Sequence, residues 1–337
     1  MSVATQSART SSRAKRAERK AKEKRAAVLQ TQMAPRKLGF IGTVKRYWQL
    51  WAMALPAIVF VAIFNYGPMY GIQLAFREFD FTKGLTGGEW VGLKYFKQFF
   101  DSPLFGTLMA NTVRISLWTL VMGFIFPIIL ALLINQIRSS KVKGFVQTIT
   151  YLPHFISTVV IVSMINLFLK PDAGVLTRVL GVIGIQSDNF MGDPNLFTPI
   201  YWITEVWQHV GWNSIIYLAA LSSVDTALYE AAKIDGAGRL QLIRYVDLPA
   251  IMPTCGVLLI LNMGNVLNVG FEKVFLMQNT LNLDASEVIS TYTYKIGILQ
   301  SQFSYSTAIG LFNMLINFAF LVIANQISRK VSNSGIF

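Results

Sequence analysis

Long apolar runs alternate with shorter polar segments along most of the chain. Six of these runs contain roughly the 20 mostly apolar residues that a helix needs to cross the hydrocarbon layer of a membrane. They predict membrane-spanning helices at about 51–76, 112–134, 147–169, 200–221, 251–275 and 305–327. The fold class predicted from this pattern is an all-α integral membrane protein with six transmembrane helices.

Composition supports this interpretation and divides the chain in two. Of its 337 residues, 53% are hydrophobic and only 14% are charged, whereas a soluble domain has about 25% charged residues. The net charge of +13 comes mostly from the amino-terminal end, because 13 of the 30 Lys and Arg residues lie before Trp51. We therefore expect a basic tail at 1–46, disordered or a surface helix against anionic lipid headgroups, and a membrane domain at 47–337. We expect no nucleic-acid partner.

The polar segment between the fourth and fifth runs, residues 222–250, is more ordered than an ordinary loop. Asp225 is placed to cap a helix over residues 226–234, which contain no Gly or Pro. Gly236 can then take a positive φ in a turn. A second helix is expected at about 237–246, with Leu240, Ile243 and Val246 on one side, before Pro249 and Pro253 mark the start of the next span.

Two interpretations of this segment follow from the residues alone. In one, the loop only caps its own helices; in the other, it is a docking surface. The second interpretation rests on Ala231 and Ala232, whose small side chains let another protein approach the backbone closely, with Glu230 available for polar contacts around them.

Strongly polar residues interrupt the apolar runs at helical spacing. Such groups are costly in a membrane and normally face other helices or a water-filled cavity. They are three or four residues apart in the fourth, fifth and sixth runs: Glu205, His209, Asn213 and Tyr217; Asn265 and Asn268; Asn313 and Asn317. Each set therefore lines one face of its predicted helix.

These polar faces have two possible roles. One is hydrogen bonding between helices, which contributes about 0.6 kcal/mol per contact and up to roughly 2 kcal/mol. The other is the lining of a pathway for a polar solute. Amides, a carboxylate and aromatic rings suit a sugar, whose hydroxyls need donors and acceptors and whose C–H face stacks on rings, so these eight residues are the candidate substrate pathway.

The sequence offers no constellation for catalysis. It contains no GxxxxGK[ST] phosphate loop, no HExxH and no GxSxG, so we expect a chain that is not an enzyme and that does not hydrolyse ATP itself. With Cys255 as the only cysteine and only two histidines, we also expect no metal site. Glu205 with His209 could instead form a proton relay, which would make the chain a proton-coupled transporter.

Residues 222–250 resemble the EAA loop of the membrane permease subunits of ABC importers. The resemblance is carried by three blocks in the family's order and spacing: Glu230-Ala231-Ala232, Asp235-Gly236-Ala237 and Leu248-Pro249. In that family the short helix docks into a groove on a cytoplasmic ATPase subunit and transmits closure of the ATPase dimer. The resemblance implies that the ATPase-coupling residues are Glu230, Ala231, Ala232, Asp235, Gly236, Leu248 and Pro249.

Over residues 47–337 the chain resembles, more narrowly, the permeases for complex oligosaccharides and polysaccharides. The matching residues are Leu55-Pro56, Phe64-Asn65-Tyr66-Gly67-Pro68-Met69-Tyr70-Gly71, Ala75-Phe76, Trp90-Val91-Gly92-Leu93, Phe96, Asn111-Thr112 and Tyr151-Leu152-Pro153-His154-Phe155-Ile156-Ser157. The resemblance implies the type I importer fold, a location in the cell membrane, and import of oligosaccharides by alternating access.

It also implies the partners: a second permease subunit, two ATPase subunits, an extracellular solute-binding protein and membrane lipid. No cofactor is expected on this chain, and ATP with magnesium would be bound by the ATPase subunits. An importer of peptides or of another small polar solute is the alternative, and a membrane scaffold or enzyme with no transport role is a more distant one.

The distribution of basic residues predicts the orientation. Six spans place both termini on one side. If that side is the cytoplasm, the inside segments hold 21 of the 30 Lys and Arg residues, as the excess of positive charge in cytoplasmic loops requires. This orientation puts residues 222–250 where a cytoplasmic ATPase could reach them.

Overall fold

The structure is a computed structural model that describes residues 40–85, 87–185, 187 and 189–332. The expected basic tail therefore lies mostly outside the described residues. The α-helices are α2 (Phe40–Arg46), α3 (Trp48–Val61), α4 (Gly67–Met69), α5 (Lys94–Phe100), α6 (Phe105–Asn135), α7 (Ser140–Tyr151), α8 (Thr158–Phe168), α9 (Val175–Val182), α10 (Pro194–Ser222), α11 (Thr226–Ile234), α12 (Arg239–Leu242), α13 (Leu248–Met263), α14 (Phe271–Met277), α15 (Leu283–Ser286), α16 (Ile289–Tyr294) and α17 (Phe303–Ser332). The chain divides into two units, Met1–Met69 and Tyr70–Phe337.

In the first unit, α3 continues through a π-helical turn at Ala62–Tyr66 into α4. Pro68 lies two residues after this turn and has no N–H to donate to the preceding turn of helix, which accounts for the wider helical turn there. Within the described part of this unit, no residue of α3 is buried. An apolar helix without buried side chains is suited to lipid or to a partner chain.

The number of helices able to cross a membrane agrees with the prediction once two bends are included. Among the described residues, four stretches are long and apolar enough: Trp48–Phe76, Phe105–Asn135, Arg239–Met263 and Phe303–Gln326. Two bent pairs, Ser140–Phe155 with Thr158–Phe168 and Pro194–Ser222 with Thr226–Ile234, bring the number to six if each pair is one span.

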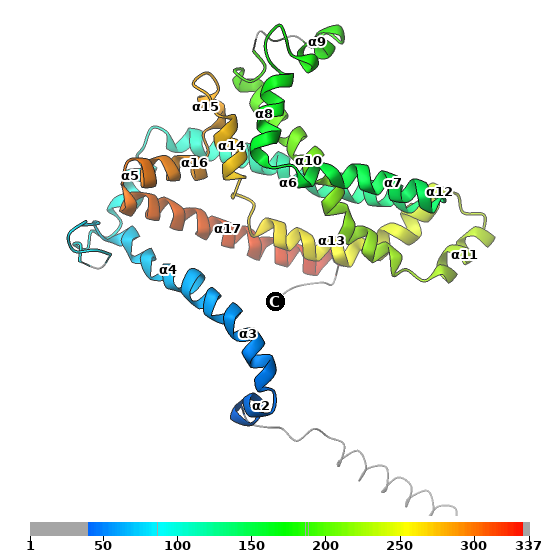
Figure 1. Cartoon of the computed structure of the whole chain (residues 1–337), viewed down its shortest axis with the longest axis horizontal. Coiled ribbons are helices and arrows are strands. Elements are labelled where there is room, and N and C mark those ends of the chain that lie inside the picture. The colour runs from blue at the N-terminus through cyan, green and yellow to red at the C-terminus, as the bar shows by residue number, and fades with distance from the viewer. Residues whose placement is uncertain (1–39, 86, 186, 188, 333–337) are drawn as a thin grey trace, which may run out of the picture. The chain divides into compact units, whose positions relative to one another are not determined.

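Four long helices, α6, α10, α13 and α17, form the body of the second unit, where α6 packs on α10 and α13 packs on α17 (Figure 1). Buried apolar clusters join the elements of this body: Ala131, Tyr217 and Ile251 bring α6, α10 and α13 together, and Ile115 and Phe197 bring α6 and α10 together with Val274 of α14. In this unit α11 lies at one end of the bundle, and α5 and α16 lie at the opposite end (Figure 1).

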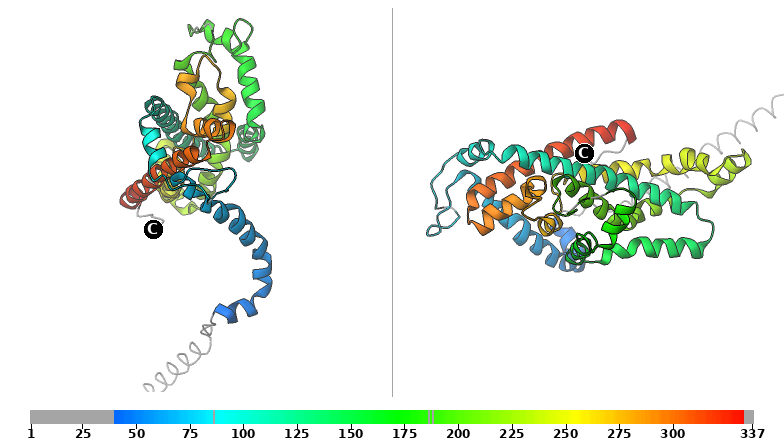
Figure 2. Two further views of the ribbon diagram at one scale, coloured as in Figure 1. Left: turned by 90° about the vertical axis from the view of Figure 1, so that its left-hand side faces the viewer. Right: turned by 90° about the horizontal axis from the view of Figure 1, so that it is seen from above.

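The span predicted at 147–169 is bent in the structure, because the chain turns by 97° between Ser140–Phe155 and Thr158–Phe168. Ile156 takes an extended conformation, and the Ser157 side chain caps α8 by accepting a hydrogen bond from the Val160 N–H. A serine cap begins a new helix rather than continuing the old one. Helix α8 therefore leaves the bundle and packs beside α14 (Figure 2).

The predicted helix at 251–275 is also different in the structure. It begins earlier, because α12 runs through a π-helical turn at Ile243–Asp247 directly into α13, so the expected second loop helix is the first part of the span. It ends earlier too, at Met263, and the chain is non-helical until α14 begins at Phe271. Apolar periodicity does not reveal this break.

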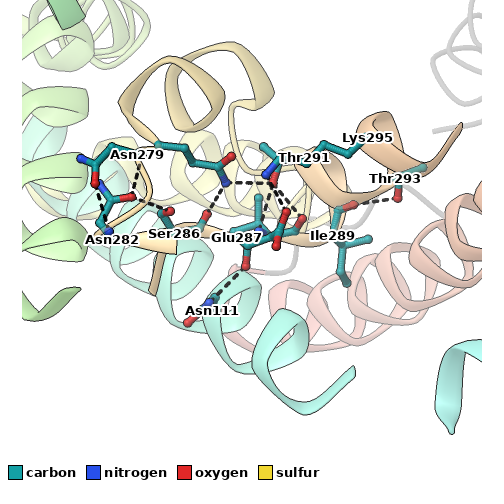
Figure 3. Close-up of polar contacts among 11 residues, drawn as sticks. Asn111, Asn279, Asn282, Ser286, Glu287, Ile289, Thr291, Thr293 and Lys295 are labelled. Atoms are coloured by element: carbon teal, nitrogen blue, oxygen red, sulfur yellow. Dashed lines mark hydrogen bonds and ion pairs between the residues drawn. The ribbon is translucent and has the colours of Figure 1, made fainter. Parts of the chain in front are cut away.

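Polar side chains hold the segment after α14 against α6 (Figure 3). Asn111 of α6 donates from Nδ2 to the carbonyl oxygens of Asp284 (2.8 Å) and Glu287 (3.1 Å). Lys295 Nζ pairs with Glu287 Oε1 at 2.7 Å, and buried Ser286 donates to Asn282 Oδ1 at 2.9 Å. The segment is therefore fixed by side-chain hydrogen bonds and is more than an open loop.

Candidate translocation cavity and coupling surface

A cavity of about 400 Å³ lies between α6, α10, α13 and the non-helical residues after α13. Its polar lining comes mainly from hydroxyl, amide and imidazole groups. The lining residues are Ser116, Thr119, Leu120, Gly123, Tyr201, Glu205, His209, Asn213, Ile216, Tyr217, Leu258, Asn262, Asn265, Val266, Asn268, Val269 and Gly270. A concave site with several convergent polar groups is typical of a small-molecule pathway.

The structure brings together six of the eight candidate pathway residues at this cavity: Glu205, His209, Asn213, Tyr217, Asn265 and Asn268. Asn265 and Asn268 belong to the non-helical break, and they are not on one face of a helix as the spacing predicted. The aromatic rings at the cavity are those of Tyr201 and Tyr217.

The other two candidates, Asn313 and Asn317 of α17, do not line the cavity and instead hold the break in place. Asn317 is buried, and its Oδ1 accepts a hydrogen bond from the Leu267 N–H at 2.9 Å. Asn313 Nδ2 and Asn317 Nδ2 donate to Asn268 Oδ1 at 3.1 and 3.4 Å. In α17, therefore, the polar face serves hydrogen bonding between helices.

Glu205 has a cationic partner that the spacing of polar residues did not indicate. Lys273 Nζ of α14 lies 2.8 Å from Glu205 Oε2, and the Lys273 ammonium also lies 5.2 Å from the centre of the Tyr201 ring. Sequence reasoning missed Lys273, although a lysine inside a predicted apolar span is itself a signal of a buried partner.

His209 extends this ion pair away from the cavity. Its Nε2 lies 3.3 Å from Glu205 Oε1, and its Nδ1 lies 3.0 Å from His154 Nδ1. The His154 ring stacks on Trp212 with 4.4 Å between ring centres. His154 comes from the turn between α7 and α8, so this chain of contacts links the bend of the third span to α10 and α14.

Two hydroxyl groups in the lining are available for a solute. Ser116 Oγ and Thr119 Oγ1 are buried and have no hydrogen-bond partner within the described residues. Buried polar atoms are normally satisfied, so these hydroxyls suit a ligand or water that supplies donors and acceptors. Among the described residues, no three His, Cys, Asp or Glu side chains lie close enough together to share a metal ion.

The predicted first helix of the loop is confirmed as α11. Asp225 Oδ1 accepts a hydrogen bond from the Ala227 N–H at 2.9 Å. At the other end, Gly236 has φ +79°. The Gly236 N–H donates to Lys233 O, and the Ala237 N–H donates to Ala232 O. This pair of bonds is the Schellman motif, which requires a left-handed residue and so favours glycine.

The outer surface of this loop carries both apolar and charged side chains and is not covered by the described chain. Glu230, Ala231, Asp235, Gly236, Leu248 and Pro249 are exposed, and Ala232 is half-buried. Ile234 is 87% exposed and Leu240 is 81% exposed. Of the apolar side expected for the second loop helix, only Leu240 is exposed. Ile243 is half-buried and packs against the cluster of Ala131, Tyr217 and Ile251, and Val246 is half-buried, so most of this side faces the bundle.

Comparison with known proteins identifies the relatives of this chain. Residues 123–333 match the family described as "Binding-protein-dependent transport system inner membrane component". The polygalacturonan/rhamnogalacturonan transport system permease protein YteP of Bacillus subtilis (strain 168) is 42% identical over 288 residues, which cover 86% of this chain and 90% of that protein. Protein LplB of the same organism is 39% identical over 300 residues, covering 89% of this chain and 94% of that protein.

Two solved structures are similar over nearly the whole of their chains. One is a bacterial ABC transporter involved in the import of the acidic polysaccharide alginate, with a TM-score of 0.79, 40% identity and coverage of 86% of this chain and 98% of that chain. The other is a bacterial alginate ABC transporter in complex with an alginate pentasaccharide-bound periplasmic protein, with a TM-score of 0.79, 39% identity and coverage of 87% and 98%.

Proposed function

Because this chain belongs to the family of binding-protein-dependent transport system inner membrane components, we propose that it is one permease subunit of an ATP-driven importer of complex oligosaccharides. It is a multi-pass protein of the cell membrane. In this role it supplies half of the translocation pathway and couples that pathway to separate ATPase subunits.

The observation that carries the proposal is the presence of two surfaces of different chemistry in one bundle. The cavity offers hydroxyls and amides to a polar solute. The loop at one end of the bundle exposes Ala231, Ile234 and Leu240, and exposed apolar groups of this kind fit a protein partner. A pathway and a docking surface are the two parts that a permease subunit needs.

The orientation follows from the partner. We place α11 in the cytoplasm, with the chain termini on the same side, in agreement with the excess of basic residues in those segments. The loaded binding protein would then dock at the opposite face. Binding of ATP with magnesium would close the ATPase dimer, and α11 would carry that motion to the bundle.

Alternating access sets a condition on the cavity. A ligand shifts the equilibrium between two states only by as much as its affinities for them differ. The cavity should therefore bind the sugar weakly in both states, and the binding protein should hold it tightly. The lining agrees with this role, since it contains few charged groups and Glu205 is already paired with Lys273.

The oligosaccharide class comes from the relatives, one of which is named for polygalacturonan and rhamnogalacturonan and another for alginate. Uronic-acid oligosaccharides are therefore the first substrates to test. The assay uses proteoliposomes that contain the complete transporter with its binding protein, and labelled galacturonate, neutral and peptide trimers. ATP-dependent uptake of a saccharide supports the proposal, and uptake of the peptide alone supports the alternative importer of peptides.

The docking surface is tested by adding one carboxylate to it. Ala231→Glu places a charge among the exposed apolar residues of α11, and we expect loss of the ATPase subunits on purification of the complex. Thr226→Glu is the matched control, because the same charge lies about 140° around the same helix. Membrane insertion should be normal in both, and retained ATPase and transport in Ala231→Glu would contradict the docking assignment.

A further inference from the structure

Asp247 is a fully buried carboxylate at the junction of three elements. Its exposure is 0%, and it lies in the π-helical turn that joins α12 to α13. Tyr229 of α11 donates from its hydroxyl to Asp247 Oδ1 at 2.5 Å. Asn135, the last residue of α6, donates to the same oxygen at 3.2 Å, and Gln136 donates to Oδ2 at 2.8 Å.

The partners of this carboxylate are neutral donors. A buried charge without a cationic partner is tolerated when hydrogen bonds satisfy its oxygens, and hydrogen bonds to an ionised acceptor are stronger than neutral ones. Burial, together with the hydrogen bond to Asp247 and the negative charge of that residue, raises the pKa of Tyr229 to about 12. The tyrosine therefore keeps its proton at neutral pH and stays a donor.

The residues of this network lie beside the proposed coupling residues in the sequence. Tyr229 directly precedes Glu230 on the exposed helix, and Asp247 directly precedes Leu248-Pro249. Neither residue belongs to the blocks that carry the family resemblance. Among the described residues, one carboxylate thus connects the docking helix to the ends of the second and fifth spans, which both reach the cavity through Ser116 and Leu258.

We propose that Asp247 is a positioning residue that clamps α11 to α6 and α13, so that displacement of α11 by an ATPase subunit moves both spans. This inference rests on the proposed function. Without the clamp, α11 would move on its own flexible connections, and ATP would be hydrolysed without transport. The clamp is a set of hydrogen bonds, so a side chain that preserves them should preserve coupling.

The test uses the complete transporter in proteoliposomes and measures molecules transported per ATP hydrolysed, alongside co-purification of the ATPase subunits. Tyr229→Phe removes one hydroxyl from the network. Tyr245→Phe removes the same group from an exposed tyrosine of the π-helical turn and is the matched control. One hydrogen bond to a charged group corresponds to at least about a tenfold change in an equilibrium. We therefore expect the transport ratio to be lower by about tenfold or more for Tyr229→Phe and unchanged for Tyr245→Phe.

Asp247 itself is tested with a graded pair. Asp247→Ala removes every hydrogen bond that this carboxylate accepts, whereas Asp247→Asn keeps an acceptor for Tyr229 and can pair with Gln136 once that amide is turned. We expect Asp247→Asn to restore most of the coupling that Asp247→Ala loses, with ATPase subunits bound in both. An unchanged ratio in Tyr229→Phe overturns the clamp even if Asp247→Ala does not fold. Failure of the wild-type ATPase subunits to co-purify contradicts the proposed function instead.

Discussion

Lys273 and Glu205 form an ion pair across 68 residues of sequence, with 2.8 Å between Nζ and Oε2. The two partners are unequally covered: the Lys273 side chain is 4% exposed, whereas that of Glu205 is 24% exposed at the cavity. The carboxylate of the pathway is therefore already neutralised by a buried cation. The main role of Glu205 in the structure is therefore to pair with Lys273.

We predict that removing the carboxylate is more harmful than removing the ammonium. Glu205→Gln leaves Lys273 buried without a counter-charge, which costs about 3–5 kcal/mol. Lys273→Met leaves a carboxylate that cavity water can reach. The midpoint of thermal unfolding of the purified complex should fall most in Glu205→Gln and recover in the double variant. A double variant no more stable than Glu205→Gln would show that the pair is not the source of the effect.

The same variant tests the proton relay. If Glu205 and His209 carried protons in transport, Glu205→Gln would change the pH dependence of uptake. Because Lys273 holds the carboxylate in an ion pair, we expect the residual uptake of Glu205→Gln to keep the pH profile of the wild type. A shifted profile would favour the relay.

The contact between α7 and α10 depends on Gly211. A Cβ at this position would lie 2.0 Å from the Thr150 carbonyl oxygen. Gly211→Ala should therefore force the helices apart, at a cost of about 1–3 kcal/mol. Gly144→Ala on α7 is the control, because a Cβ there meets no atom within 4 Å in the described chain. We expect this control to unfold no earlier than the wild type, and equal losses of stability in both variants would contradict the packing argument.

Asn317 should matter more to stability than its neighbour Asn313. Asn317→Leu leaves the buried Leu267 N–H without its acceptor, and an unsatisfied buried donor costs about 1–3 kcal/mol. Asn313→Leu loses only a bond to the exposed Asn268 side chain. Thermal unfolding of the two variants in the same detergent checks this order, and a larger loss of stability in Asn313→Leu would contradict it.

The effect of a substitution at Gly236 should depend on the backbone conformation that the new residue can adopt and not on steric contacts. A Cβ there meets nothing within 4 Å of the described residues, but φ is +79°. Left-handed backbone costs about 1–2 kcal/mol for most residues and less for Asn, and proline cannot adopt it. Co-purification of the ATPase subunits should decrease from Gly236→Asn through Gly236→Ala to Gly236→Pro, with membrane insertion intact. Full docking in Gly236→Pro would contradict a role for this turn.

The sequence by itself determined the class of the molecule and the local structure of its coupling loop. Membrane spans follow from runs of apolar residues, because a single helix must satisfy its own backbone hydrogen bonds in lipid. The Asp225 cap and the Gly236 turn depend on residues within a few positions of each other. Membership of the permease family was also predictable from the sequence, because the blocks that carry the resemblance are short and lie in a fixed order. The family match over residues 123–333 confirms it.

Only the tertiary structure decided where the spans bend and which polar groups meet. Asn317 accepts a hydrogen bond from the Leu267 N–H in the non-helical break, and Lys273 pairs with Glu205. Asp247 accepts hydrogen bonds from side chains of α6 and α11. Each of these contacts joins residues that are distant in sequence or on different elements. Periodicity reports which face of a helix is polar, but a hydrogen bond also needs a partner at about 3 Å, and the packing of the helices sets that distance.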